Sequence, residues 1–110
     1  MNKVILMGRL ARDPECRTTQ SGQMKANFTL AVDRMSKEKM ADFIGLTAWG
    51  KTAEFVSQYL CKGRQVLVEG RIQTGSYEKD GKKVYTTDVM VDRIEFADKK
   101  PQGNAEEPPF

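Results

Sequence analysis

Apolar and polar residues alternate with a period of two along most of the chain, which is the pattern of β-strands with one buried face. The alternation predicts five strands, over residues 2–10, 24–34, 42–50, 65–77 and 83–96. Turn-forming residues separate these segments. No internal repeat interrupts the pattern. The chain is therefore predicted to be mainly β.

The segments between the strands predict turns and one helix. Asp13-Pro14 and Ser21-Gly22 mark turns, residues 34–40 form a charged hairpin loop, and Asp80-Gly81 is typical of a tight hairpin. The helix is indicated by apolar residues at helical spacing, which are Ala53, Val56, Tyr59 and Leu60. Thr52 is its predicted N-cap and Gly63 its predicted stop.

This order of elements predicts a fold. Three strands, one short helix and two further strands are the order of a five-stranded OB-fold Greek-key barrel, an all-β fold with one helix. We expect the barrel domain over residues 1–97. Residues 98–110 have no apolar periodicity and are predicted to be a short disordered tail.

Because successive side chains of a strand point to opposite faces, the alternation predicts which residues face the inside of the barrel. The inward set comprises Val4, Leu6, Gly8, Leu10, Ala26, Phe28, Leu30, Val32, Ile44, Leu46, Ala48, Val66, Val68, Gly70, Ile72 and Thr74. The first strand also carries apolar residues, Ile5 and Met7, on its other face. A strand that is apolar on both faces is expected to be covered twice, once by the core and once by another subunit.

The same alternation places three aromatic residues on the outer surface of the barrel. Phe43 and Trp49 share the outward face of the third strand with Gly45 and Thr47, and Tyr77 lies outward on the fourth strand near Arg71. Each base stacked on an aromatic ring contributes about 1–3 kcal/mol whatever its identity. These residues therefore predict a stacking platform for single strands. The alternative for each ring is packing under a loop or in a subunit contact.

Charge is distributed unevenly along the chain. All 18 Lys and Arg lie in residues 1–100 against 13 of the 15 Asp and Glu, a balance of +5, whereas residues 101–110 carry only Glu106 and Glu107. A basic body favours a polyanionic partner, and an acidic tail favours a separate task. The alternative is a solvated surface of mixed sign.

Composition argues against several other classes. The chain has no histidine and only two cysteines, Cys16 and Cys61, which are far apart in sequence. The commonest general base and the commonest zinc ligands are thus scarce, so we expect no catalytic site, metal or cofactor. No signal sequence or apolar run of about 20 residues is present, which predicts a cytoplasmic protein without a membrane segment.

Residues 1–97 resemble the bacterial single-stranded DNA-binding protein family. The matching segments are 2–10, 13–15, 26–31, 48–51, 53–54, 59–63, 68–71 and 85–89, in that order. The resemblance implies an OB fold, assembled as a homotetramer, that binds single-stranded DNA without sequence specificity. It also implies a nucleoid-associated role in DNA replication, recombination and repair.

The resemblance further implies roles for particular residues. Phe43, Trp49 and Tyr77 occupy positions where the family places base-stacking aromatics. Candidate phosphate contacts are Lys3, Arg9, Arg34, Lys51 and Arg71. The family often has another aromatic after the second strand, where this chain has Met35 and Ser36.

The last residues resemble the tip through which family members dock replication and repair proteins. This tip is Glu106-Glu107-Pro108-Pro109-Phe110, in which a phenyl ring and a carboxylate would share one basic-rimmed pocket. It has only two acidic residues and a short preceding tail. The alternative is an inert frayed terminus.

Three other functions remain open at this point. One is a sister OB module for replication restart or for coating RNA, since nothing in the pattern reads a 2′-hydroxyl. Another is a nuclease, against which the missing histidine and the lack of clustered carboxylates argue. The third is a protein-interaction OB domain, against which the basic body and the outward aromatics argue.

Overall fold

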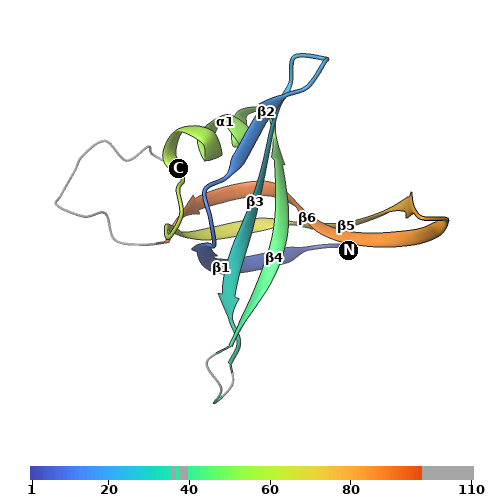
Figure 1. The fold of residues 1–110 in the computed structure, drawn as a ribbon. Coiled ribbons are helices and arrows are strands. Elements are labelled where there is room, and N and C mark those ends of the chain that lie inside the picture. Colours follow the sequence, from blue (N-terminus) through green and yellow to red (C-terminus); the bar gives the residue numbers. More distant parts are fainter. Residues whose placement is uncertain (36, 38–39, 98–110) are drawn as a thin grey trace.

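The computed structural model describes residues 1–35, 37 and 40–97. The elements in chain order are β1 (Val4–Leu10), β2 (Glu15–Thr18), β3 (Met24–Asp33), β4 (Ala41–Trp49), α1 (Gly50–Tyr59), β5 (Gln65–Lys79) and β6 (Lys82–Phe96). The ribbon shows β3 and β4 crossing β1, β5 and β6 at a steep angle (Figure 1). Among these residues no helix is both long and apolar enough to cross a membrane.

Strand pairing closes a barrel. The strand order is β1-β5-β6-β4-β3-β2, and an additional pairing of β1 with β3 joins the sheet to itself. The pairs are antiparallel except β4 with β6, which run parallel. The five strands β1, β3, β4, β6 and β5, with α1 between β4 and β5, form the predicted OB barrel. The fold prediction is confirmed.

The core lies inside this barrel and under α1. Leu10, Leu30, Leu46, Val68 and Ile94 are each at most 2% exposed. The helix adds a further layer by burying Ala53, Phe55 and Val56. Burial of such side chains is the main stabilising contribution to the fold. The predicted inward positions in the middle of the barrel strands are thus confirmed.

The first turn region contains a strand that the sequence pattern missed. Residues of β2 pair with β3 from Glu15 opposite Asn27 to Thr18 opposite Met24. All four β2 residues are exposed. Because neither face of β2 is buried, no apolar alternation marks it.

The helix starts and ends earlier than predicted. It begins at Gly50, directly after β4, and Trp49 rather than Thr52 is the N-cap residue, without a side-chain cap. The left-handed φ of Gly50, +61°, turns the chain from strand to helix at this point. The helix ends at Tyr59, and Gly63 lies in the turn that follows, where its N–H donates to the Leu10 carbonyl at 2.9 Å.

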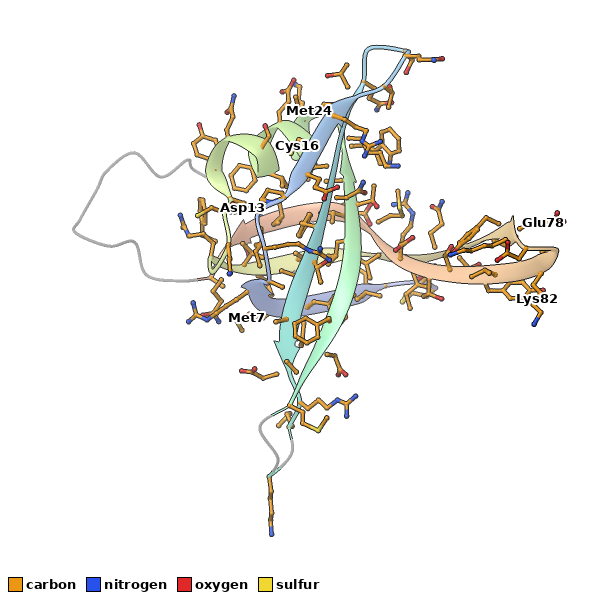
Figure 2. All side chains as sticks on the ribbon, in the orientation of Figure 1. Met7, Asp13, Cys16, Met24, Glu78 and Lys82 are labelled. Atoms are coloured by element: carbon orange, nitrogen blue, oxygen red, sulfur yellow. The ribbon has the colours of Figure 1, made fainter. Side chains whose placement is uncertain are left out.

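Strands β5 and β6 continue beyond the barrel as a two-stranded arm (Figure 1). Glu78 and Lys82 mark its outer end (Figure 2). The prediction that Ile72 and Thr74 face the core is wrong, because both are exposed, Ile72 by 45%. The alternation continues along the arm after the core has ended.

A register shift between Glu69 and Gly70 lies where the buried positions of β5 end. Glu69 pairs with Arg93 but Gly70 pairs with Val91, so Asp92 is an extra residue on β6. A Cβ atom on residue 70 would lie 2.2 Å from the Met90 carbonyl oxygen. Only glycine permits this close backbone approach.

Candidate nucleic-acid interface

The outward face of β3 and β4 carries a row of cross-strand pairs. Along β4, the outward residues Phe43, Gly45, Thr47 and Trp49 lie opposite Ala31, Thr29, Asn27 and Lys25 of β3. Phe43 is 69% exposed and Trp49 37%. Six residues of strand separate their Cα atoms by about 20 Å. The structure therefore places two exposed rings on one surface, as the alternation predicted.

Lys25 lies against the indole of Trp49. Its Nζ atom is 5.3 Å from the ring centroid, within the range of cation–π attraction. A ring next to a cation can contact a base and its phosphate together. Sequence reasoning placed Lys25 outward but did not select it. What identifies Lys25 is its position on β3 directly opposite Trp49 on β4. That position can be known only from the register in which the two strands pair.

A polar cavity of about 310 Å³ opens between the two ends of this row. Its lining includes Asn27 and Thr29 of β3, Gly45 and Thr47 of β4, and Asp88 of β6. The Thr47 hydroxyl donates to Asn27 Oδ1 at 3.0 Å. Hydrogen-bonding groups thus lie on the same surface as the aromatic rings.

The arm carries exposed tyrosines on both of its faces. Tyr77 is 51% exposed and Tyr85 75%. Because Tyr77 pairs with Val84 while Tyr85 pairs with Ser76, the two rings point to opposite sides of the arm. The Lys83 Nζ lies 5.6 Å from the Tyr85 centroid. Sequence reasoning missed Tyr85, although its place beside the Asp-Gly turn was visible.

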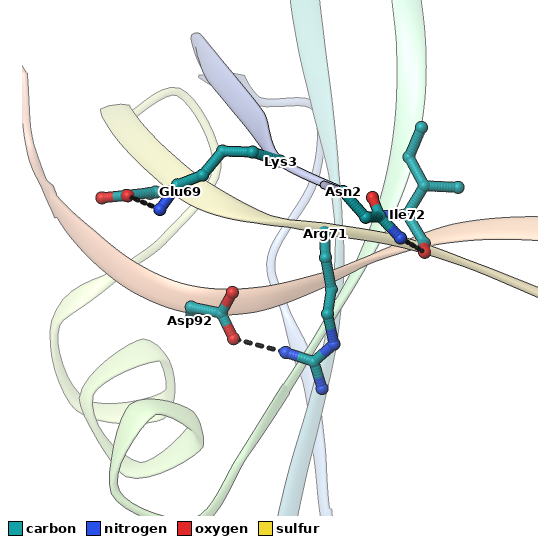
Figure 3. A network of polar contacts seen from close by, with 6 residues as sticks. All are labelled: Asn2, Lys3, Glu69, Arg71, Ile72 and Asp92. Atoms are coloured by element: carbon teal, nitrogen blue, oxygen red, sulfur yellow. Dashed lines mark hydrogen bonds and ion pairs between the residues drawn. The ribbon is translucent and has the colours of Figure 1, made fainter.

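Four of the five predicted phosphate-binding residues have partners within the protein. Lys3 forms an ion pair with Glu69, and Arg71 forms one with Asp92 (Figure 3). The Arg34 Nε atom lies 2.8 Å from Asp42 Oδ1, and an Arg9 guanidinium N–H donates to the Gly63 carbonyl at 3.0 Å. All four side chains are exposed. Lys51, in the first turn of α1, forms no ion pair with any residue that the structure describes.

The ion pair between Lys3 and Glu69 shifts the pKa of both groups. A hydrogen bond from the Lys3 ammonium, with its charge, lowers the pKa of Glu69, and the carboxylate raises the pKa of Lys3. Asn2 lies beside this pair and forms two hydrogen bonds with Ile72. The Asn2 amide N–H donates to the Ile72 carbonyl at 2.7 Å, and Asn2 Oδ1 accepts from the Ile72 N–H at 2.9 Å. These contacts hold residues 2 and 3 against β5.

The outer face of β1 is apolar and uncovered in the single chain. Ile5 is 66% exposed and Met7 51%. A cavity of about 200 Å³ at Ile5 is lined by Ile5, Leu67, Glu69, Arg93 and Glu95. This surface is separate from the aromatic row on β4, since the lining residues come from β1, β5 and β6.

The described part of the chain contains no group of three His, Cys, Asp or Glu residues that could hold a metal ion. Both cysteines are free and exposed. Partial burial raises the pKa of the Cys16 thiol. The predicted partner-binding residues Glu106, Glu107, Pro108, Pro109 and Phe110 lie outside the described residues, as does Ser36.

The barrel and the outward row on β3 and β4, with its two aromatic rings and Lys25, define an OB-fold protein of the type that binds oligonucleotides. The sequence model of the Single-strand binding protein family matches residues 1–97. The chain belongs to this family, as its sequence segments predicted.

Several named relatives are similar over most of the chain. Single-stranded DNA-binding protein of Clostridium perfringens is 55% identical over 100 residues, which cover 89% of this chain and 67% of the relative. The protein of the same name from Fusobacterium nucleatum is 48% identical over 106 residues, with 91% and 69% covered. Single-stranded DNA-binding protein 1 of Staphylococcus aureus is 50% identical over 105 residues, with 91% and 67% covered.

Proposed function

We propose that this protein binds single-stranded DNA without sequence specificity and protects it during replication, recombination and repair, as a non-catalytic protein of the bacterial cytoplasm and nucleoid. The observation that carries the proposal is the pair of exposed rings, Phe43 and Trp49, on one face of β4. Unpaired bases expose ring faces that duplex DNA keeps stacked, so aromatic rings select for single strands. Membership of the family and the names of the relatives support it.

Stacking and charge have separate tasks in this proposal. Phe43, Trp49 and Tyr77 stack on bases, whereas Lys3, Arg9, Arg34, Lys51 and Arg71 neutralise phosphates. The exposed ion pairs of Lys3, Arg34 and Arg71 do not prevent this, because surface pairs are weak and a phosphate can replace the carboxylate. Lys25 and Tyr85 join the candidate contacts for the geometric reasons given above.

The proposed assembly is a homotetramer. The uncovered Ile5 and Met7 side chains on β1 support a contact between subunits, since contiguous apolar patches on soluble proteins mark interaction sites. Residues 1–97 are proposed as the DNA-binding domain, and residues 98–110 as the acidic tail. Within that tail, residues 106–110 are proposed to dock replication and repair proteins.

The test is a salt-dependent binding titration. Labelled dT oligomers, matched rU oligomers and duplex DNA are titrated with the full chain, and binding is followed by fluorescence anisotropy. We expect the dT oligomer to bind most tightly. Its log K should fall with log salt by about 0.7 for each phosphate contacted. Absence of binding to dT would refute the proposal, and a flat salt response would refute the phosphate contacts.

The same titration separates the proposed function from an RNA-coating protein and from a protein-interaction domain. Equal or tighter binding of rU would favour an RNA-coating protein, and a replication-restart module would differ in its protein partners rather than in DNA binding. Incubation of labelled DNA with Mg²⁺ checks for nuclease activity, for which we expect intact substrate. No binding to any nucleic acid would favour the protein-interaction domain.

A further inference from the structure

The polar cavity on the outer face of β3 and β4 has a specific origin. Gly45 contributes no side chain to its floor, and Asp88 reaches into this space from β6. A Cβ atom on residue 45 would lie 3.2 Å from Asp88 Oδ1. We call the part of the cavity around Gly45 the β4 notch and define it by Asn27, Gly45, Thr47 and Asp88; elsewhere the cavity is also lined by the charged residues Arg12, Asp13, Glu15 and Lys25. The notch is thus a gap in the outward row of β4 with a carboxylate in it.

The hydrogen-bonding capacity of the notch is only partly used within the protein. The Thr47–Asn27 bond at 3.0 Å, in which the Thr47 hydroxyl donates, leaves the Asn27 amide N–H groups and both acceptor lone pairs of the Thr47 hydroxyl available. Asp88 forms no ion pair or hydrogen bond with any residue in the described part of the chain. The carboxylate therefore presents both oxygens to a ligand as acceptors.

The position of the notch brings bases over it. Adjacent bases in a stacked strand are about 3.4 Å apart. Phe43 and Trp49, about 20 Å apart along β4, therefore cannot hold neighbouring bases. A strand stacked on both rings must pass intervening nucleotides across Gly45 and Thr47.

The carboxylate of Asp88 determines which chemical groups can bind in the β4 notch. A carboxylate repels a phosphate but accepts hydrogen bonds from the exocyclic amino group of cytosine. Adenine and guanine also carry amino donors, whereas thymine presents two carbonyl acceptors and a single imino donor. We propose that the β4 notch takes one base of the bound strand, and that Asp88 favours bases with an exocyclic amino group over thymine. This inference rests on the proposed function and adds a modest base preference to it.

The experiment compares two homopolymers in three proteins. Affinities for dC and dT oligomers of equal length are measured at about pH 8, where cytosine is unprotonated, for the wild type, Asp88→Asn and Glu54→Gln. Homopolymers remove the choice of binding register. Glu54→Gln is the matched control, because it removes one carboxylate charge on α1, outside the notch. Each variant is compared with the wild type by its ratio of dC to dT affinity, so the intrinsic stacking of the two homopolymers cancels.

We expect the ratio to fall about 5-fold in Asp88→Asn, because a hydrogen bond from an amino group to a charged carboxylate is stronger than one to a neutral amide oxygen. The ratio should not change in Glu54→Gln, even if both affinities rise through the lost charge. An unchanged ratio in Asp88→Asn overturns the inference. Failure of the wild type to bind either oligomer overturns the proposed function instead.

A second variant covers the case in which Asp88→Asn does not fold. In Gly45→Ala the added Cβ would lie 3.2 Å from Asp88 Oδ1, so the methyl group narrows the notch and crowds the carboxylate while its charge remains. We expect the same direction of change in the ratio, with quenching of Trp49 by dT preserved. A wild-type ratio in Gly45→Ala overturns the inference equally.

Discussion

Trp49 is the residue on which the stacking model can be tested most directly, because it is the only tryptophan in the chain. We expect its fluorescence to be quenched when dT oligomers bind. Trp49→Ala should weaken binding by about 1–3 kcal/mol per site, whereas Trp49→Phe should retain most of the affinity because a ring remains. Binding that proceeds by anisotropy without quenching would remove Trp49 from the interface.

The Lys3–Glu69 pair predicts a pH dependence of stability. The pKa of Glu69 is lowered from 4.5, so its contribution is complete above that value and is lost as pH falls through the lowered folded pKa. The pKa of Lys3 is raised from 10.5, so its contribution is complete below that value and is lost as pH rises through the raised folded pKa. Between these limits the contribution is constant.

Glu69→Gln should therefore be less stable than the wild type near neutral pH, and the difference should shrink as the pH falls through the acid range. Urea unfolding at several pH values measures this. The control is Glu54→Gln, because the Glu54 carboxylate of the wild type forms no ion pair with a described residue. A stability difference that does not depend on pH in the acid range would contradict the assigned pairing.

At the residue scale, the sequence predicted which side chains face outward but not their partners. The exposure of Phe43 and Trp49 follows from alternation along one strand, which is local information. The partners of Lys3, Arg34 and Arg71 lie on other strands or across a loop. Their identification requires the strand register, which no local pattern contains. Asp88, in the notch, was inaccessible for the same reason.

Among the elements, β5 shows best what periodicity can and cannot predict. The pattern correctly gave inward positions for Val66 and Val68, which are fully buried. It failed at Ile72, because alternation tells which residues share a face but not whether anything covers that face. The transition lies at Gly70, where the register shifts.

Gly70→Ala should destabilise the barrel by about 1–3 kcal/mol, the range for forcing an extra methyl group into a packed site. The obstacle is the Met90 carbonyl oxygen, which cannot move without bending β6. The control is Gly75→Ala on the arm, where the nearest atom is the Thr86 hydroxyl at 3.1 Å, a side-chain atom. Denaturant unfolding measures both, and equal stabilities would contradict the close approach.

For the whole molecule, the apolar face of β1 predicts the assembly state. We expect the wild type to sediment as a tetramer, and Ile5→Asp with Met7→Asp to sediment as a smaller species, because charges would be buried at the contact. Ile72→Asp is the matched control, an exposed apolar residue on β5 away from Ile5 and Met7, and should leave assembly unchanged. A folded wild-type monomer at micromolar concentration would overturn the proposal.

The acidic tail predicts a separation of two functions. Glu106 and Glu107 carry charge of the same sign as DNA, so deletion of residues 106–110 should leave DNA affinity unchanged or slightly higher. The deletion should abolish binding to replication and repair proteins. Phe110→Ala should show much of the same defect with the acidic charge retained. Pull-down and anisotropy assays measure the two activities, and normal partner binding by the deletion variant would refute the docking role.

The pairing of β1 with β5 also sets the order of events in folding. Val4 pairs with Gly70, so β1 gains its longest set of hydrogen bonds only after the three intervening strands and the helix are available. Barrels dominated by such non-local pairs fold in about milliseconds to seconds, slowly for a chain of this size. During synthesis, Ile5 and Met7 emerge long before either β5 or a second subunit can cover them. Until the barrel closes, this exposed apolar face makes the incomplete chain prone to aggregation.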